Sequence, residues 1–128
     1  MALNSLMPQL SSSFGALSRQ ELTDIIESEV SMLFMAVEDG HYYGSLTLVR
    51  FKIPSGYRAW IEDVVVGEWA RGKGVGKKLV EHAVRIANES NVKSIDLTAR
   101  SSRVAAVSLY KKLGFKDRET TAFRYMGN

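Results

Sequence analysis

The sequence predicts an α/β protein whose mixed sheet is mostly antiparallel and carries helices on its faces. Apolar and β-branched residues dominate segments 31–37, 43–52 and 58–66, which is typical of strands. Residues 74–90 instead repeat their apolar side chains every three to four positions, as an amphipathic helix does. Antiparallel hairpins that lead into a strand-helix-strand crossover make one mixed sheet.

Two helices are expected before the first strand. The first follows a set of apolar residues at helical spacing, and Pro8 in the middle of this set is compatible with a first turn that begins near the proline. The second covers residues 19–29, because Ser18 and Glu21 fit the capping box S-x-x-E. The two apolar faces consist of Leu3, Leu6, Met7 and Leu10, and of Leu22, Ile25, Ile26 and Val30.

Turn residues separate the predicted strands. Asp39-Gly40 is a two-residue hairpin signal, since both residue types accept positive φ angles. Pro54-Ser55-Gly56 marks the next turn. These turns predict three consecutive antiparallel strands.

Strands and helices alternate in the predicted C-terminal part. A strand over 92–99 follows the long helix, and a helix over 102–113 comes next. Gly114 is the glycine expected just beyond a helix end, where Phe115 can make the accompanying apolar contact. The last predicted strands are 115–118 and 121–126.

Composition narrows the class of protein. The 128 residues, 45% of them hydrophobic, are expected to form one domain, 1–128, with a real core. The sequence lacks cysteine and has two distant histidines, so neither a disulfide nor a metal site is expected. No run approaches the roughly 18 apolar residues of a membrane span, and no signal peptide is recognisable, so we expect a cytoplasmic protein without membrane contact. The net charge of +3 suits a polyanionic ligand.

The most informative segment is Arg71-Gly72-Lys73-Gly74-Val75-Gly76, between a predicted strand and a predicted helix. Glycines let the backbone approach a ligand closely. The first N–H groups of a helix have no partner within it, and the helix dipole adds partial positive charge there. With Arg71 and Lys73 beside them, these groups predict a site for a diphosphate.

Other glycine-rich sites fit this segment less well. The dinucleotide fingerprint G-x-G-x-x-G fails, because the third glycine comes one residue early and Lys77 stands in its place. The P-loop G-x-x-x-x-G-K-[ST] fits from Gly67 to Lys73, but Gly74 replaces the hydroxyl residue that would bind Mg²⁺. A turn that only packs helix on strand is the structural alternative, although packing does not require flanking cations.

These features together resemble the GNAT superfamily of N-acetyltransferases. Residues 71–76 fit the family signature [QR]-x-x-G-x-[GA], and similar segments precede and follow it at suitable spacing. The resemblance covers about residues 30–126. The flanking segments are Ile61-Glu62-Asp63-Val64-Val65-Val66 and Ser108-Leu109-Tyr110-Lys111-Lys112-Leu113-Gly114-Phe115.

Two departures from the family pattern bear on the site. Family members open with a short strand before the first helix, and that strand is missing from the elements predicted here. Many members also have asparagine seven residues before the tyrosine of the later helix. That position is Arg103, whose cation could contact the coenzyme's phosphates instead.

The resemblance implies the acyl-CoA N-acyltransferase fold, with acetyl-CoA as co-substrate. The pantetheine arm would lie where the strand ending at Val66 diverges from the strand near Ser94, and a backbone N–H there would polarise the thioester carbonyl. The coenzyme-binding residues so implied are Val64, Val65, Val66, Arg71, Gly72, Lys73, Gly74, Val75, Gly76, Lys77 and Arg103.

Tyr110 is the first candidate catalytic residue. It matches the family's tyrosine that protonates the thiolate leaving group. Its spacing alone favours a core aromatic on the stripe formed with Ala106 and Leu113. Both interpretations are compatible, because the ring can pack while its hydroxyl reaches the site.

Glu62 is the second candidate catalytic residue. A lysine-like amine is mostly protonated at pH 7, so a base is expected. Glu62 and Asp63 are the acids beside the expected thioester site, and strand alternation points them to opposite faces. Glu62 is favoured over Asp63 as the base. The alternative is that both are solvated or pair with Arg58.

The sequence therefore predicts an enzyme that transfers acetyl from acetyl-CoA to a primary amine of a small molecule or peptide, by direct attack with both substrates bound. The alternative is a non-catalytic acyl-CoA-binding module that regulates a partner. His41 and His82 are expected to be surface residues, and no aromatic-basic interleaving indicates a nucleic-acid site. Family members are often homodimers, but the sequence does not set the oligomeric state.

Overall fold

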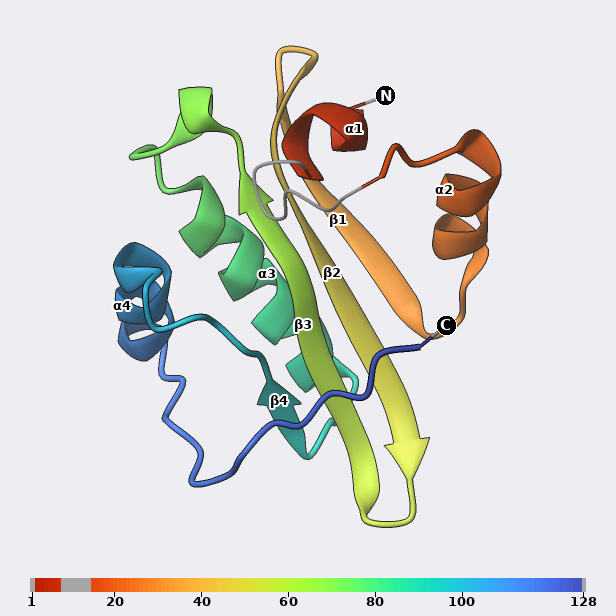
Figure 1. Ribbon diagram of the computed structural model, residues 1–128, viewed down its shortest axis with the longest axis vertical. Coiled ribbons are helices and arrows are strands. Elements are labelled where there is room, and N and C mark those ends of the chain that lie inside the picture. The colour runs from red at the N-terminus through yellow and green to blue at the C-terminus, as the bar shows by residue number, and fades with distance from the viewer. Residues whose placement is uncertain (1, 8–14, 128) are drawn as a thin grey trace. The chain divides into compact units, whose positions relative to one another are not determined.

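The computed structural model describes residues 2–7 and 15–127 (Figure 1). The chain divides into two compact units, Met1–Thr98 and Ala99–Asn128. The first unit contains the sheet and the helices α1 (Ala2–Leu6), α2 (Arg19–Glu27) and α3 (Val75–Glu89), and the second contains α4 (Val104–Lys112). That the whole chain acts as one domain stays a prediction.

The sheet has the predicted mixed topology. Its strands are β1 (Ser31–Glu38), β2 (His41–Ile53), β3 (Gly56–Val66) and β4 (Ser94–Asp96), in the order β1-β2-β3-β4. The β1–β2 and β2–β3 pairs are antiparallel, whereas β3 and β4 are parallel. Helix α3 connects β3 to β4, so the crossover expected after the hairpins is confirmed.

Both predicted turns are present. Asp39 and Gly40 have φ angles of 51° and 76°, and Glu38 pairs with His41 across them. Positive φ at both central residues is the geometry of the primed turn that matches strand twist. Residues 54–55 form the next turn, where Ile53 pairs with Gly56.

The core lies between the sheet and its helices. Figure 1 shows α3 on one face of the sheet and α1 on the other. Burying an apolar stripe against a sheet stabilises such a helix more than its own propensity does. The buried apolar side chains of this first unit are Leu3, Leu6, Leu46, Leu48, Ala59, Ile61, Val65, Ala70, Leu79, Val80, Ala83 and Ala87.

The predicted capping box begins α2. The Glu21 N–H donates to the Ser18 hydroxyl over 3.1 Å, and the Ser18 N–H donates to the Glu21 carboxylate over 3.0 Å. The backbone and side-chain hydrogen bonds with Ser18 hold the pKa of the Glu21 carboxyl below its usual range. The expected apolar face is only partly covered, because Ile26 is 64% exposed.

Several predicted elements differ in the structure. The strand expected over 92–99 is limited to β4, and neither 115–118 nor 121–126 forms a strand. An alternating apolar pattern makes a strand only where another strand offers hydrogen bonds, and among the described residues the segment at 121–126 has none. Pro8 and Leu10 lie outside the described residues. Within the described part of the chain, no helix is both long and apolar enough to span a bilayer.

Candidate functional site

The predicted diphosphate loop connects β3 to α3. A short 3₁₀ turn, Glu68–Ala70, leads into it. Gly72 and Gly74 have φ angles of 82° and 76°, where side chains with a Cβ are strained. A Cβ at either glycine would meet no heavy atom within 4 Å. The loop therefore needs these glycines for its backbone conformation and not to make room for packing.

The beginning of α3 has the properties of an anion site. Gly74 is the N-cap residue and offers no side chain to cap the helix, and the first turn contains no acidic residue. The first N–H groups of a helix have no partner within it. Lys77 places a cation in this turn, although the helix dipole disfavours positive charge there. A bound anion would reverse that unfavourable interaction.

The cations of the loop are not neutralised by ion pairs. Neither Arg71 nor Lys77 lies within 4.0 Å of a carboxylate among the described residues. The Lys73 ammonium instead lies over the Tyr43 ring, 5.7 Å from its centroid. This cation–π contact ties the loop to β2 and leaves the charge of Lys73 uncompensated.

The sheet opens between β3 and β4. The parallel pairing joins only Arg58–Trp60 to Ser94–Asp96. Beyond Trp60, β3 continues to Val66 with no strand paired to it on the β4 side within the described residues. The divergence expected near Val66 is thus present, and among the described residues the edge of β3 beside the predicted positions Val64 and Val66 has no strand partner.

A β-bulge interrupts β3 at Asp63. Ser45 pairs with Val65 and Thr47 pairs with Glu62, so the two β2 residues, two positions apart, face β3 residues three positions apart. Asp63 has a φ angle of +50°, which is uncommon for a residue other than glycine. Because directly paired residues share a face, Val65 lies on the face of Glu62. Simple alternation, which would place Val64 and Val66 there, does not hold.

Tyr110 lies in α4, in the second unit. The N-cap residue of this helix is Arg103. Tyr110 is buried, at 8% exposure, and burial raises the pKa of its phenol above the usual 10.0, while the Arg103 charge acts less strongly in the opposite direction. Tyr110 is therefore protonated at neutral pH, as a proton donor must be.

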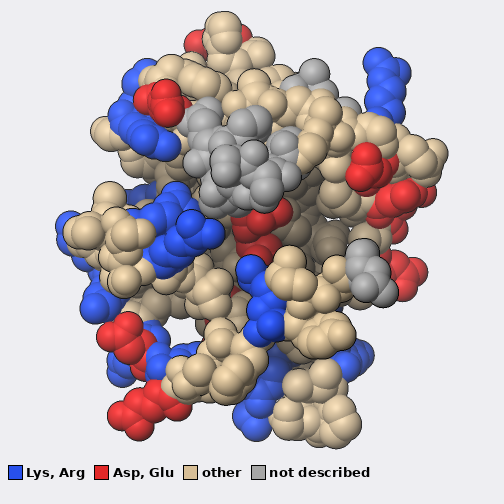
Figure 2. Space-filling view, in the orientation of Figure 1, with Lys and Arg blue, Asp and Glu red and all other residues tan. Residues whose placement is uncertain are grey.

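Surface charge is mixed. Figure 2 shows lysine and arginine side chains beside aspartate and glutamate on the same face of the molecule. Within the described residues, no group of three histidine, cysteine or acidic side chains is placed to hold a metal ion.

Comparison with known proteins identifies the family. The model of the acetyltransferase (GNAT) family matches residues 2–115. The chain belongs to the GNAT family. The matched residues include the glycine loop before α3, the bulged strand β3 and the helix that carries Tyr110.

Individual GNAT relatives agree with this assignment. An N-alpha-acetyltransferase MAK3 of Arabidopsis thaliana is 30% identical over 84 residues, or 66% of this chain and 44% of the relative. A streptothricin acetyltransferase of Streptomyces lavendulae is 34% identical over 64 residues, or 46% of this chain and 34% of the relative. The chain thus spans less than half of the length of these two curated relatives.

Solved GNAT-like structures share the fold. A putative acetyltransferase of Agrobacterium tumefaciens superposes with a TM-score of 0.87 at 26% identity, covering 98% of this chain and 92% of that one. The glucosamine-6-phosphate N-acetyltransferase of Arabidopsis thaliana superposes with a TM-score of 0.81 at 23% identity, covering 95% and 87%. The second likeness concerns the fold alone.

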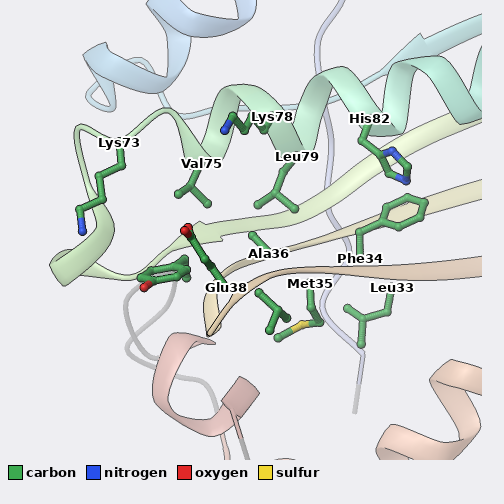
Figure 3. A pocket seen from close by; sticks show the side chains of 12 residues that line it. Leu33, Phe34, Met35, Ala36, Glu38, Lys73, Val75, Lys78, Leu79 and His82 are labelled. Carbon is green, nitrogen blue, oxygen red and sulfur yellow. The ribbon is translucent and has the colours of Figure 1, made fainter. Parts of the chain in front are cut away.

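The sequence did not predict a groove that lies between β1 and α3. It has a volume of about 570 Å³ and separates β1 from the first turns of the helix (Figure 3). His82, expected to be a surface residue, lines it and meets the Phe34 ring edge to face, 4.8 Å between centroids. The lining residues are Leu33, Phe34, Met35, Ala36, Val37, Glu38, Tyr43, Lys73, Val75, Lys78, Leu79 and His82.

Proposed function

We propose that this chain is an N-acetyltransferase that transfers the acetyl group of acetyl-CoA to a primary amine of a small molecule or peptide. The observation that carries the proposal is the loop before α3. Gly72 and Gly74 open the backbone toward free space, and the uncapped helix start adds outward N–H groups. GNAT acetyltransferases use acetyl-CoA, whose diphosphate is complementary in charge to this site.

The residues fit the coenzyme in two places. The diphosphate would accept hydrogen bonds from the N–H groups of the loop and of the first turn of α3, with cations on either side. The pantetheine arm would add to the free edge of β3 beyond Trp60, beside the bulge. The proposed coenzyme-binding residues are Val64, Val65, Val66, Arg71, Gly72, Lys73, Gly74, Val75, Gly76, Lys77 and Arg103.

The reaction is a direct acyl transfer. The amine nitrogen attacks the thioester carbonyl carbon, and the carbon–sulfur bond breaks as the amide forms. A backbone N–H of the bulged strand donates to the oxygen on which negative charge develops. Tyr110 donates its phenol proton to the departing thiolate, and its raised pKa keeps the phenol protonated at neutral pH before the transfer.

Glu62 is proposed to take the proton that the amine loses. Glu62 is exposed and directly precedes the bulge residue Asp63. Glu62→Gln should lower kcat/KM most strongly at acidic and neutral pH, because the amine then depends on spontaneous deprotonation. Asp63→Asn is the matched control, and an equal loss in both variants would remove Glu62 from this role.

The chemical class of the acceptor is proposed from the names of two relatives. The name of one relative specifies N-alpha-acetylation, and the name of the other specifies streptothricin as its substrate. We therefore propose a free amine as the common acceptor chemistry. A first panel would contain an unblocked peptide and streptothricin, with an N-terminally blocked peptide without lysine as the control.

The proposal is tested by thermal unfolding with acetyl-CoA, CoA, ATP and NAD, followed by a CoA-release assay with the amine panel. A ligand at 100 times its Kd adds about 2.7 kcal/mol of stability. For a domain of this size the midpoint should rise on the order of 10 °C. A rise with acetyl-CoA and CoA alone, followed by amine-dependent CoA release, supports an enzyme. Coenzyme binding without release from any amine indicates a non-catalytic acyl-CoA-binding module.

A further inference from the structure

The first residues of β2 contact the connection between β3 and α3 at several points. This connection, called the glycine loop below, comprises residues 67–74 and contains the proposed diphosphate site. The contacts come from two neighbouring residues, Tyr43 and Gly44, which lie near the hairpin between β1 and β2. Neither belongs to the coenzyme-binding residues named above.

The backbone of Tyr43 holds the loop where β3 ends. The Gly67 N–H donates to the Tyr43 carbonyl oxygen over 2.9 Å. The Gly67 carbonyl oxygen in turn accepts from the Ala70 N–H over 2.8 Å, within the 3₁₀ turn that follows. The hydrogen bond to β2 therefore fixes the direction in which the loop leaves the sheet.

Tyr43 is the extra residue of a β-bulge. Ala36 of β1 pairs with Gly44, and the next β1 residue, Val37, pairs with Tyr42. Tyr43 is thus the β2 residue between two consecutive pairs. A bulge turns one side chain away from the regular alternation of the strand and occurs often beside functional sites.

The side chain of this bulged residue contacts the middle of the loop. The Tyr43 ring lies beneath the Lys73 ammonium, whose nitrogen is 5.7 Å from the ring centroid. A lysine side chain has high rotamer entropy, and attraction to a ring restricts it before any ligand arrives. The ring does not neutralise the charge, so Lys73 keeps a cation beside the loop.

Gly44 allows the start of α3 to approach the sheet. A Cβ at Gly44 would lie 2.8 Å from the Val65 carbonyl oxygen and 3.1 Å from side-chain carbons of both Val75 and Leu79. The carbonyl oxygen belongs to the backbone of β3, so no rotamer change would relieve that contact. Val75 and Leu79 point from α3 toward the sheet (Figure 3). Only glycine permits this approach, which sets the position of the helix start.

On the basis of the acetyl-CoA site proposed above, we propose that Tyr43 and Gly44 are positioning residues for the coenzyme. Tyr43 fixes the beginning and the middle of the glycine loop, and Gly44 fixes the helix start at its end. Neither residue needs to touch the coenzyme. Groups that are held in place before binding lose less conformational entropy on binding, and this raises affinity.

The test compares Tyr43→Leu with Tyr43→Phe and Tyr57→Leu in the full chain. Phenylalanine keeps an aromatic face beneath Lys73, whereas leucine removes it. Tyr57 is the matched control, because its ring lies beneath Lys52 at nearly the same distance, 5.6 Å, near the opposite end of β3. Calorimetry measures CoA affinity, and mass spectrometry measures hydrogen exchange of residues 67–74 without ligand. Denaturant unfolding gives the stability of each variant.

We expect Tyr43→Leu to weaken CoA binding about two- to fivefold, the usual effect of one exposed cation–π contact. Hydrogen exchange in the ligand-free loop should become faster. Tyr43→Phe should keep both quantities at their wild-type values, and Tyr57→Leu should change stability alone. When Lys73 is already replaced by Met, adding Tyr43→Leu should cost no further affinity, because the ring acts through the lysine.

Turnover and a second variant give independent measurements. In Tyr43→Leu the KM for acetyl-CoA should rise while the KM for the amine stays unchanged, a separation that a general loss of stability would not produce. Gly44→Ala should weaken CoA binding and speed hydrogen exchange at residues 75–79, because the added Cβ displaces the helix start or the Val65 carbonyl group.

Three outcomes would overturn this role of Tyr43 and leave the proposed function intact. The first is a wild-type CoA affinity in Tyr43→Leu, with or without faster loop exchange. The second is an equal loss of affinity in Tyr43→Leu and Tyr57→Leu, which would reflect stability alone. The third is a rise of both KM values together. Failure of the proposed function is distinguishable, because the wild-type chain itself would then not bind CoA, and the positioning role would fail with it.

Discussion

The backbone N–H of Phe115 donates to the carbonyl oxygen of Tyr110 over 3.0 Å, and the two rings meet edge to face with centroids 6.1 Å apart. The Gly114 N–H also donates to the Lys111 carbonyl oxygen, over 3.1 Å, and Gly114 has a φ angle of 101°. These two bonds and the apolar contact form a Schellman motif. The helix end thereby fixes the residue proposed as the proton donor.

Gly114→Ala should lower stability by about 1–2 kcal/mol, because a Cβ is strained at positive φ. The space around Gly114 is open, and an added Cβ would meet no heavy atom within 4 Å, so a clash would not account for the loss. Gly127→Ala is the matched control, since that glycine does not have a positive φ. Chemical denaturation measures the effect, and equal stabilities of the two variants would contradict it.

Stability should fall as the pH rises above about 10, the ordinary pKa of tyrosine. Burial raises the pKa of Tyr110 in the folded chain, so the unfolded chain loses this proton first. The contribution is complete below pH 10 and disappears as the pH rises through the folded-state pKa. Tyr110→Phe should flatten this part of the pH-stability profile. An unchanged alkaline slope in the variant would assign the effect to other tyrosines.

Tyr110→Phe should reduce turnover by about 10²–10⁴-fold, the usual contribution of a positioned general acid. The phenyl ring keeps the contact with Phe115, so acetyl-CoA affinity should change far less. Steady-state kinetics and calorimetry separate the two quantities. An unchanged kcat in the variant would show that Tyr110 is not the proton donor and serves in packing.

Gly74→Glu should abolish coenzyme binding, since it places bulk and negative charge in the proposed diphosphate site. The φ angle of 76° strains any replacement, so Gly74→Ala serves as the control for backbone strain. Calorimetry with CoA should show a far larger loss for glutamate than for alanine. If the glutamate variant still bound CoA tightly, the loop before α3 would not be the diphosphate-binding site.

Lys77→Glu should stabilise the ligand-free protein by about 1 kcal/mol, because the helix dipole favours negative charge in the first turn. The same change should weaken coenzyme binding, since it replaces an attracting charge with a repelling one. Lys112→Glu, at the other end of a helix, should lose stability instead. If Lys77→Glu stabilised the chain without weakening binding, the lysine would not contact the coenzyme.

The sequence by itself determined the features that form among neighbouring residues. The turn at Asp39-Gly40, the capping box of Ser18 and Glu21, and the helix end at Gly114 all depend on contacts within about five positions. The order of the elements as far as α4 and the position of the glycine loop were predicted for the same reason. Local conformational preference alone indicates such features, and here it agrees with the fold as a whole.

Only the tertiary structure decided the features that depend on distant segments. Strand β4 ends at Asp96, residues 115–126 form no strand, and the bulge at Asp63 appears only in the pairing of β3 with β2. The groove at His82 likewise needs β1 and α3 side by side. Apolar alternation is the same for a paired and an unpaired segment, because strand pairing depends on hydrogen-bond partners that are remote in the chain.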